Sequence, residues 1–100
     1  MHTITADEFR AEVGVEDWLP GERGAVAEFR TGDFAAGAKL FAAIAELAEA
    51  ANHHPDVTVT YPSVRVTLIT HSAGGLTARD LALAQQISAA ARDLGVEATV

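Results

Sequence analysis

The chain has 100 residues, of which 49% are apolar and 21% are charged, the balance of an ordinary soluble globular protein. This length supports one domain and is too short for two, so we expect a single domain over residues 1–100. The formal net charge of −7 comes from 14 acidic and 7 basic side chains. Because no cluster of lysine and arginine offsets that charge, direct binding to nucleic acid is disfavoured.

Three features that the sequence lacks restrict the kind of protein further. The chain has no cysteine, which excludes a disulfide framework and a thiolate zinc site. The N-terminus has neither the basic region nor the apolar core of a secretory signal. No apolar run approaches the roughly 20 residues that span a bilayer. We therefore expect a cytoplasmic protein without membrane attachment.

The N-terminal third predicts a short helix followed by a hairpin. In Thr5-Ala6-Asp7-Glu8 the first and last side chains have the spacing of a capping box, so we expect a helix over 6–13. The turn signal Pro20-Gly21 then precedes an alternating apolar segment. We interpret 15–31 as a β-hairpin.

The longest predicted helix covers 34–51, where apolar residues recur at helical spacing. Thr31 or Asp33 is suited to cap its N-terminus. Pro55 limits its other end, because a proline pushes the preceding residue out of the helical region.

A second hairpin and a third helix complete the chain. The segments 57–61 and 64–70 alternate between apolar and polar residues, as strands with one buried face do. A second capping box, Thr77 to Asp80, opens a helix over 78–93. The order α-β-β-α-β-β-α predicts an α+β domain with an antiparallel sheet and its helices packed on one face.

Three of the four histidines and two carboxylates fall between Glu49 and Asp80. Imidazole is the only side chain whose unperturbed pKa lies near neutrality, so three of them gathered by a fold make a candidate proton-transfer site. Glu49 and His53 are four residues apart, so both lie on one face of the helix end if the helix extends to His53, and the carboxylate can then fix the tautomer of the imidazole or raise its pKa. The alternative is an exposed pair that adds about a few tenths of a kcal/mol to stability.

The other candidates each carry a structural alternative. His54 precedes Pro55 and is therefore held in extended geometry, which suits either a shared pocket or an ordinary polar loop. His71 ends the last strand and by parity lies on the face opposite Val64. Asp80 either only completes the capping box or also takes part in the chemistry.

Two aromatic residues are most simply explained by packing. Tyr61 ends a strand face and suits the sheet. Trp18 suits the core, although an indole near a pocket can also stack on a flat heterocycle.

A metal site and a serine hydrolase are both disfavoured. Three histidines and a carboxylate could bind zinc or non-haem iron, but adjacent histidines diverge in an extended chain and no H-x-H or H-x3-H pair is present. Ser72 adjoins His71 without the sequence of a nucleophile elbow.

The pattern Glu-x3-His-His-Pro-x5-Tyr-x9-His-x8-Asp, which runs from Glu49 to Asp80, resembles the signature of the pterin-4a-carbinolamine dehydratases. The resemblance covers nearly the whole chain and includes Trp18, the Glu-Phe-Arg-Thr-Gly-Asp-Phe segment at 28–34, and Gly-Gly-Leu-Thr at 74–77. It implies a four-stranded antiparallel sheet covered by helices on one side.

The resemblance also implies an activity. Members of the family dehydrate 4a-hydroxytetrahydropterin to quinonoid dihydropterin in tetrahydrobiopterin recycling, without a metal or a redox cofactor. By analogy His53, His54 and His71 are the catalytic residues around the pterin, with His54 and His71 at the leaving hydroxyl and His53 at the ring or its N5. Supporting or substrate-binding roles fall to the other signature residues, Glu49, Pro55, Tyr61 and Asp80.

Two alternatives to this enzyme remain open. One is a non-catalytic pterin-binding or protein-binding member of the same family, and the less favoured one is a metal-dependent lyase or hydrolase. Ser72 departs from the family pattern, in which an aspartate or asparagine often follows the histidine. The family resemblance further implies a homodimer or homotetramer, and nothing in the sequence supports carrying over the coactivator role of some relatives.

Overall fold

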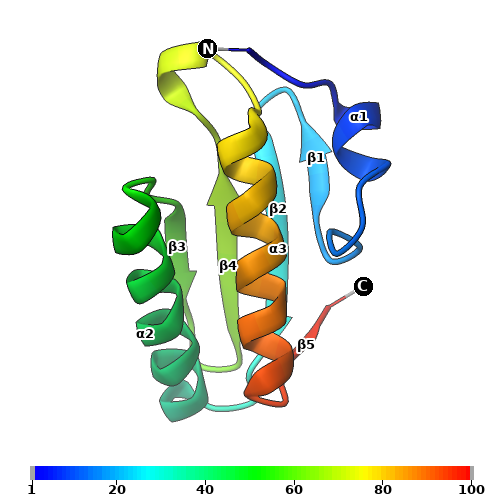
Figure 1. Cartoon of the computed structure of the whole chain (residues 1–100). Helices are drawn as coiled ribbons and strands as arrows, with labels where there is room; N and C mark the ends of the chain where they lie inside the picture. Colours follow the sequence, from blue (N-terminus) through cyan, green and yellow to red (C-terminus); the bar gives the residue numbers. More distant parts are fainter. Residues whose placement is uncertain (1, 100) are drawn as a thin grey trace.

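A computed structural model describes residues 2–99 as an α+β structure with three α-helices and one antiparallel sheet (Figure 1). Along the chain the elements are α1 (Ala6–Arg10), β1 (Leu19–Gly21), β2 (Gly24–Arg30), α2 (Phe34–Ala51), β3 (Asp56–Val59), β4 (Ser63–Leu68), the 3-10 turn η1 (His71–Ala73), α3 (Ala78–Asp93) and β5 (Glu97–Ala98).

The sheet has five strands, so the predicted four strands and the predicted element order are wrong. The spatial order is β1-β2-β4-β3, and β5 pairs with β2 on the edge that β1 also uses. The two-residue β5 is too short to show an alternating pattern. It reaches the sheet because Gly95, at φ 74°, turns the chain back after α3, and the Val96 amide bonds the Ala91 carbonyl at 2.8 Å.

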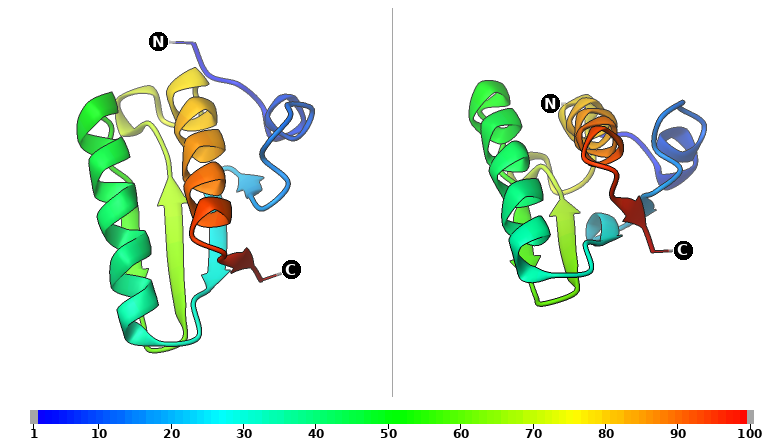
Figure 2. Two further views of the ribbon diagram at one scale, coloured as in Figure 1. Left: turned by 60° about the horizontal axis from the view of Figure 1, so that its bottom comes forward. Right: turned by 90° about the horizontal axis from the view of Figure 1, so that it is seen from below.

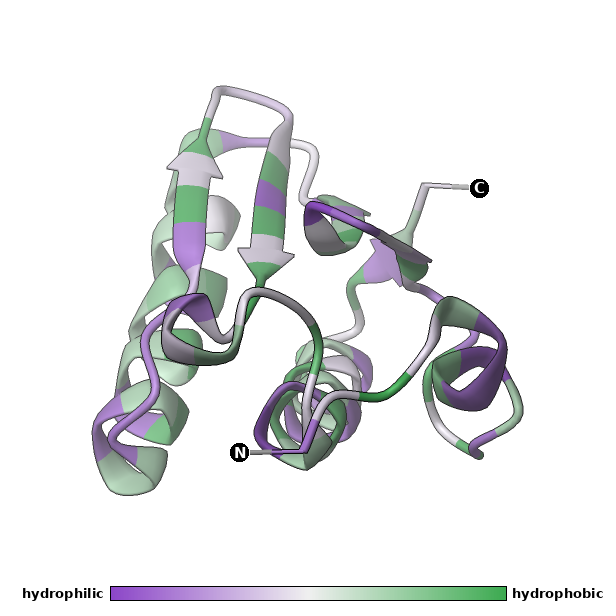
Figure 3. Cartoon of the chain, turned by 90° about the horizontal axis from the view of Figure 1, so that it is seen from above, coloured by the Kyte–Doolittle hydropathy of each residue, from purple (hydrophilic) through white to green (hydrophobic). Residues whose placement is uncertain are grey.

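The helices cover one face of the sheet, as predicted. Figures 1 and 2 show α2 and α3 lying side by side over the same face, with α1 beside β1 at the edge. The residues that point into this layer are at most 2% exposed and alternate along β2 and β4: Ala25, Ala27, Phe29, Val64, Val66 and Leu68. Figure 3 shows the matching alternation of apolar and polar positions along the strands.

Local signals fixed several boundaries. The helices predicted over 34–51 and 78–93 have those bounds, Asp33 caps the first of them, and both predicted capping boxes form. None of the helices within residues 2–99 has the length and apolarity to cross a membrane.

Several predicted segments extend beyond the elements that form. The strand predicted over 57–61 is β3, which ends at Val59. α1 stops at Arg10 instead of continuing to 13, because the following turns bring Val15 and Trp18 into the core, where each is at most 5% exposed. β4 stops at Leu68, before the predicted end at Thr70. The chain leaves the sheet there and enters the turn that contains His71.

Candidate active site

The site lies where the C-terminus of α2, the end of β4 and the N-terminus of α3 meet, at the top of Figure 1. At the end of α2, Asn52 adopts the left-handed conformation, with φ 49° and ψ 44°, and its amide bonds the carbonyls of Ala48 and Glu49. The His53 amide bonds the Ala48 carbonyl at 3.1 Å. This reversal turns His53 inward, where it is 8% exposed, while His54 stays at the surface.

His53 is held by a buried carboxylate from α3. Its Nε2 lies 2.6 Å from Oδ1 of Asp80, a residue with no exposed surface. The second carboxylate oxygen of Asp80 accepts bonds from the Thr70 hydroxyl at 2.7 Å and the Thr77 amide at 2.9 Å. Asp80 therefore completes the capping box of α3 and also pairs with His53.

This arrangement selects the tautomer of His53. An ionised carboxylate only accepts hydrogen bonds, so Nε2 of His53 carries the proton that it donates to Asp80. In the neutral ring the lone pair is then on Nδ1. The buried carboxylate thus leaves Nδ1 as the ring nitrogen that can take up a proton.

His54 is held by a second, exposed carboxylate. Its Nε2 lies 2.5 Å from Oε2 of Glu49, and the two side chains are 58% and 76% exposed. The sequence predicted a Glu49–His53 pair on one helix face. That pairing is wrong, because Asn52 ends the helix before His53 and the helical spacing no longer applies.

An apolar cavity of about 300 Å³ adjoins this second pair. Glu49 and His54 form its polar part, between α2 and β3. The other residues that line the cavity are all apolar: Phe41, Ile44, Ala45, Ala48, Pro55 and Val57. A hollow with an apolar wall and a few fixed polar groups is the usual form of a small-molecule site.

His71 is brought to the same end of the molecule by the turn that follows β4. It is exposed and opens η1, and its neighbour Thr70 bonds Asp80. Through Thr70 and Asp80, the segment carrying His71 is therefore linked to His53. The parity that predicted the direction of His71 does not extend to it, since the strand has ended at Leu68.

Sequence reasoning missed two residues that build this junction. Thr70 is one, and Arg79 is the other: its Nη2 donates to the Asn52 carbonyl at 2.6 Å. This bond ties the start of α3 to the turn from which His53 leaves α2. No local spacing signals it, because the two residues are 27 positions apart.

A protein-family model and several curated relatives match this chain. Residues 2–90 match the family model described as pterin 4 alpha carbinolamine dehydratase. The chain belongs to this family. The membership that the sequence signature predicted is thereby confirmed.

Two relatives and one solved structure illustrate the similarity. Proteins named "Putative pterin-4-alpha-carbinolamine dehydratase" are 46% identical over 71 residues in Chloroflexus aurantiacus and 42% identical over 88 residues in Cyanothece sp.. The first match covers 71% of this chain and 76% of the relative, and the second covers 85% and 89%. A crystal structure of a "transcriptional coactivator/pterin dehydratase" from Brucella melitensis is 30% identical, with a TM-score of 0.81 over 90% of this chain and 99% of that one.

Not every residue of the pterin-4a-carbinolamine dehydratase signature lies at the histidines. Pro55 lines the apolar cavity beside His54. Tyr61, 69% exposed, is in the turn between β3 and β4, at the opposite end of the hairpin from His54 and His71. Tyr61 therefore does not join the histidine cluster.

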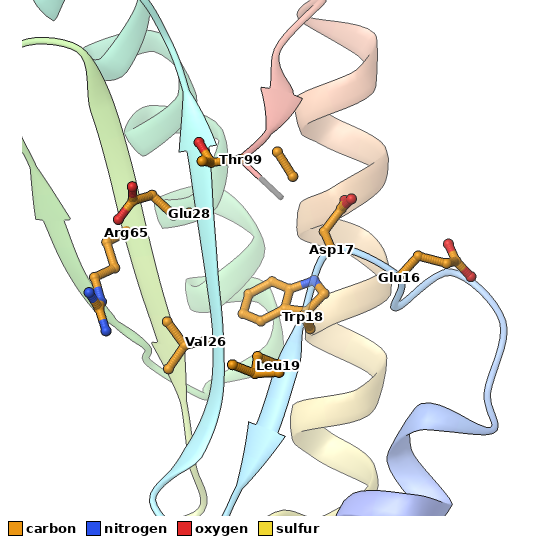
Figure 4. A pocket seen from close by; sticks show the side chains of 9 residues that line it. Glu16, Asp17, Trp18, Leu19, Val26, Glu28, Arg65 and Thr99 are labelled. Atoms are coloured by element: carbon orange, nitrogen blue, oxygen red, sulfur yellow. The ribbon is translucent and has the colours of Figure 1, made fainter.

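Trp18 is a core residue in this dehydratase-family chain. Its indole nitrogen donates to the Ser88 hydroxyl at 2.9 Å, and its ring meets Phe29 edge-on with centroids 6.3 Å apart. Trp18 also lines a cavity of about 480 Å³, together with Leu19, Val26 and Arg65 (Figure 4). That cavity is on the sheet face that the helices leave uncovered, and no histidine lines it.

Proposed function

We propose that this chain dehydrates 4a-hydroxytetrahydropterin to quinonoid dihydropterin in tetrahydrobiopterin recycling, by acid–base catalysis at its histidines. The observation that carries the proposal is the presence of two imidazole–carboxylate contacts at consecutive histidines, His53–Asp80 and His54–Glu49. The second of these pairs lines the apolar cavity. One pair is buried and the other exposed, so the two rings meet different surroundings. Family membership supports the substrate class.

The reaction needs only two proton transfers. The lone pair of N5 forms a double bond to C4a while the bond from C4a to the hydroxyl oxygen breaks. An acid gives the departing oxygen a proton, so that it leaves as water, and a base takes the proton from N5. A positioned acid or base typically contributes about 10²–10⁴-fold each to such a step.

The histidines suit these tasks in different ways. His54, exposed at the cavity and hydrogen-bonded to Glu49, is suited to protonate the leaving hydroxyl. We assign His71 to the same substrate group, as the family resemblance implies. His53, whose Nε2 is occupied by Asp80, offers Nδ1 to the pterin ring or its N5. Glu49 and Asp80 act by holding the imidazoles.

The test is the dehydration of enzymatically generated 4a-hydroxytetrahydropterin, followed by ultraviolet absorbance. Wild type is compared with a His54→Ala/His71→Ala double variant, and binding of a reduced pterin is measured for both. Acceleration by the wild type alone supports the proposal. Wild type that binds pterin without accelerating the reaction contradicts it.

The second candidate is a non-catalytic binding member of the family. It is favoured by one observation, the printed description of the Brucella melitensis structure, which names a transcriptional coactivator together with a pterin dehydratase. Pterin binding without turnover in the same assay would support this candidate.

The proposal includes the cytoplasmic location and the homodimeric or homotetrameric state that the family resemblance implies. Light scattering on the purified chain measures its mass and so tests the oligomeric state. A monomeric mass at micromolar concentration would contradict it.

A further inference from the structure

We infer that Thr70 is a positioning residue that holds the buried His53–Asp80 pair and the His71 turn in one geometry. The inference deepens the proposed function and rests on it for the kinetic part of its test. Thr70 is only 3% exposed, so it acts through its neighbours and touches no solvent-borne ligand. Its side chain and its backbone bond two different parts of the site.

The side chain belongs to a directed chain of hydrogen bonds. The single hydroxyl proton of Thr70 is donated to Oδ2 of Asp80 at 2.7 Å. Thr70 and Thr77 hydroxyl oxygens lie 2.8 Å apart, so in this contact Thr77 donates and Thr70 accepts. The Thr77 oxygen in turn accepts the Arg79 amide at 3.3 Å. The order is therefore Thr77 to Thr70 to Asp80, with His53 donating to Asp80 from the other side.

This chain fixes the carboxylate independently of His53. Oδ2 of Asp80 has two donors, the Thr70 hydroxyl and the Thr77 amide, whereas Oδ1 faces His53. In this buried chain the bond from Thr77 polarises the Thr70 hydroxyl and so strengthens its bond to Asp80, and the donors together hold the plane of the carboxylate. The plane of the Asp80 carboxylate then sets the direction of the His53 ring.

The backbone of Thr70 closes the turn that carries His71. Its carbonyl accepts the amides of Ala73 and Gly74, each at 3.0 Å, and its amide donates to the Gly75 carbonyl at 3.0 Å. Thr70 thus anchors the His71 turn through its backbone and the carboxylate partner of His53 through its hydroxyl.

The test compares Thr70→Val, which keeps the shape and removes the hydroxyl, with Thr70→Ser, which keeps the hydroxyl. The matched control is Thr67→Val, at a half-buried position on β4, where the side chain lies on the sheet face opposite to that of the buried Val66 and Leu68. We expect Thr70→Val to lower kcat about 10- to 100-fold with a smaller change in KM, as loss of an outer hydrogen-bond partner typically does. Thr70→Ser and Thr67→Val should keep kcat near the wild-type value.

The imidazole nitrogens of His53 give a readout that does not need turnover. In wild type their 15N chemical shifts should report a proton on Nε2, and Thr70→Val should change those shifts while Thr67→Val leaves them unchanged. A purely structural role for Thr70 would lower thermal stability and leave the shifts and kcat as they are. That result, or a Thr70→Ser variant as impaired as Thr70→Val, would overturn the inference.

Wild type supplies a further measurement should Thr70→Val fail to fold. A buried hydroxyl that donates to a carboxylate exchanges its proton slowly enough to be seen by NMR, so a Thr70 hydroxyl resonance close to the Asp80 side chain is expected. Its absence from a spectrum that resolves the Thr77 hydroxyl would overturn the inference. Inactive wild type would instead overturn the proposed function, since the NMR results do not depend on catalysis.

Discussion

His53 and Asp80 lie 2.6 Å apart, although they come from the ends of two different helices and are 27 residues apart in the chain. The contact joins the C-terminus of α2 to the N-terminus of α3, where a carboxylate also interacts favourably with the helix dipole. Asp80 has three hydrogen-bond donors and no exposed surface. A structural cap and a partner for a histidine are thus combined in one side chain.

Asp80→Asn should impair activity and stability together. Asparagine keeps the size, but its amide group cannot accept from all three donors, so a buried polar group is left unsatisfied. We expect kcat to fall about 10- to 100-fold and the free energy of unfolding to fall by about 1–3 kcal/mol. Urea denaturation and the dehydration assay measure these effects.

The control is Asp33→Asn, at the N-cap of α2 at the other end of the molecule. Asparagine caps helices as well as aspartate does, so kcat and the free energy of unfolding should both stay near the wild-type values. Wild-type turnover in Asp80→Asn would contradict a role for the His53–Asp80 pair.

His54→Ala should separate activity from folding. The His54 side chain is 58% exposed and packs little, so its removal should leave the fold intact. If it supplies the proton to the leaving hydroxyl, kcat should fall about 10²–10⁴-fold. Circular dichroism checks the fold of the variant, and stopped-flow absorbance measures its rate of dehydration. A variant with full activity would show that the acid has been misassigned.

Glu49→Gln should have a smaller effect. Its contact with His54 is exposed, and surface ion pairs typically contribute about 0–1 kcal/mol, so little change in unfolding free energy is expected. The rate should fall by no more than about 10-fold, the lower limit for loss of an outer partner. Glu46→Gln, on the preceding turn of α2, is the matched control. A loss as large as that of His54→Ala would place Glu49 in the proton transfer itself.

Trp18→Phe tests whether the indole stabilises the core or binds the pterin. Phenylalanine removes the buried bond to Ser88 and leaves that hydroxyl without its donor, which should lower the free energy of unfolding by about 1–3 kcal/mol. Because Trp18 lies apart from the histidines, KM and kcat should be unchanged at temperatures where the variant is folded. A raised KM with unchanged stability would assign the indole to substrate binding.

The sequence by itself determined what depends on near neighbours. The bounds of α2 and α3, a cap at Thr31 or Asp33 and both capping boxes follow from residues within one or two helical turns of each other. The spacing from Glu49 to Asp80 also indicated the family, because the signature is a linear pattern. These features need no knowledge of the packed fold.

Only the tertiary structure decided which carboxylate meets which histidine. The left-handed Asn52 turns His53 into the core toward Asp80 and leaves His54 for Glu49, opposite to the pairing that helical spacing predicted. The fifth strand, the place of Tyr61 away from the site and the contacts of Thr70 and Arg79 were likewise set by packing. The contacts of β5, Thr70 and Arg79 each join residues from different elements. The His53–Asp80 and Arg79–Asn52 contacts form only when α2 and α3 pack on the same face of the sheet.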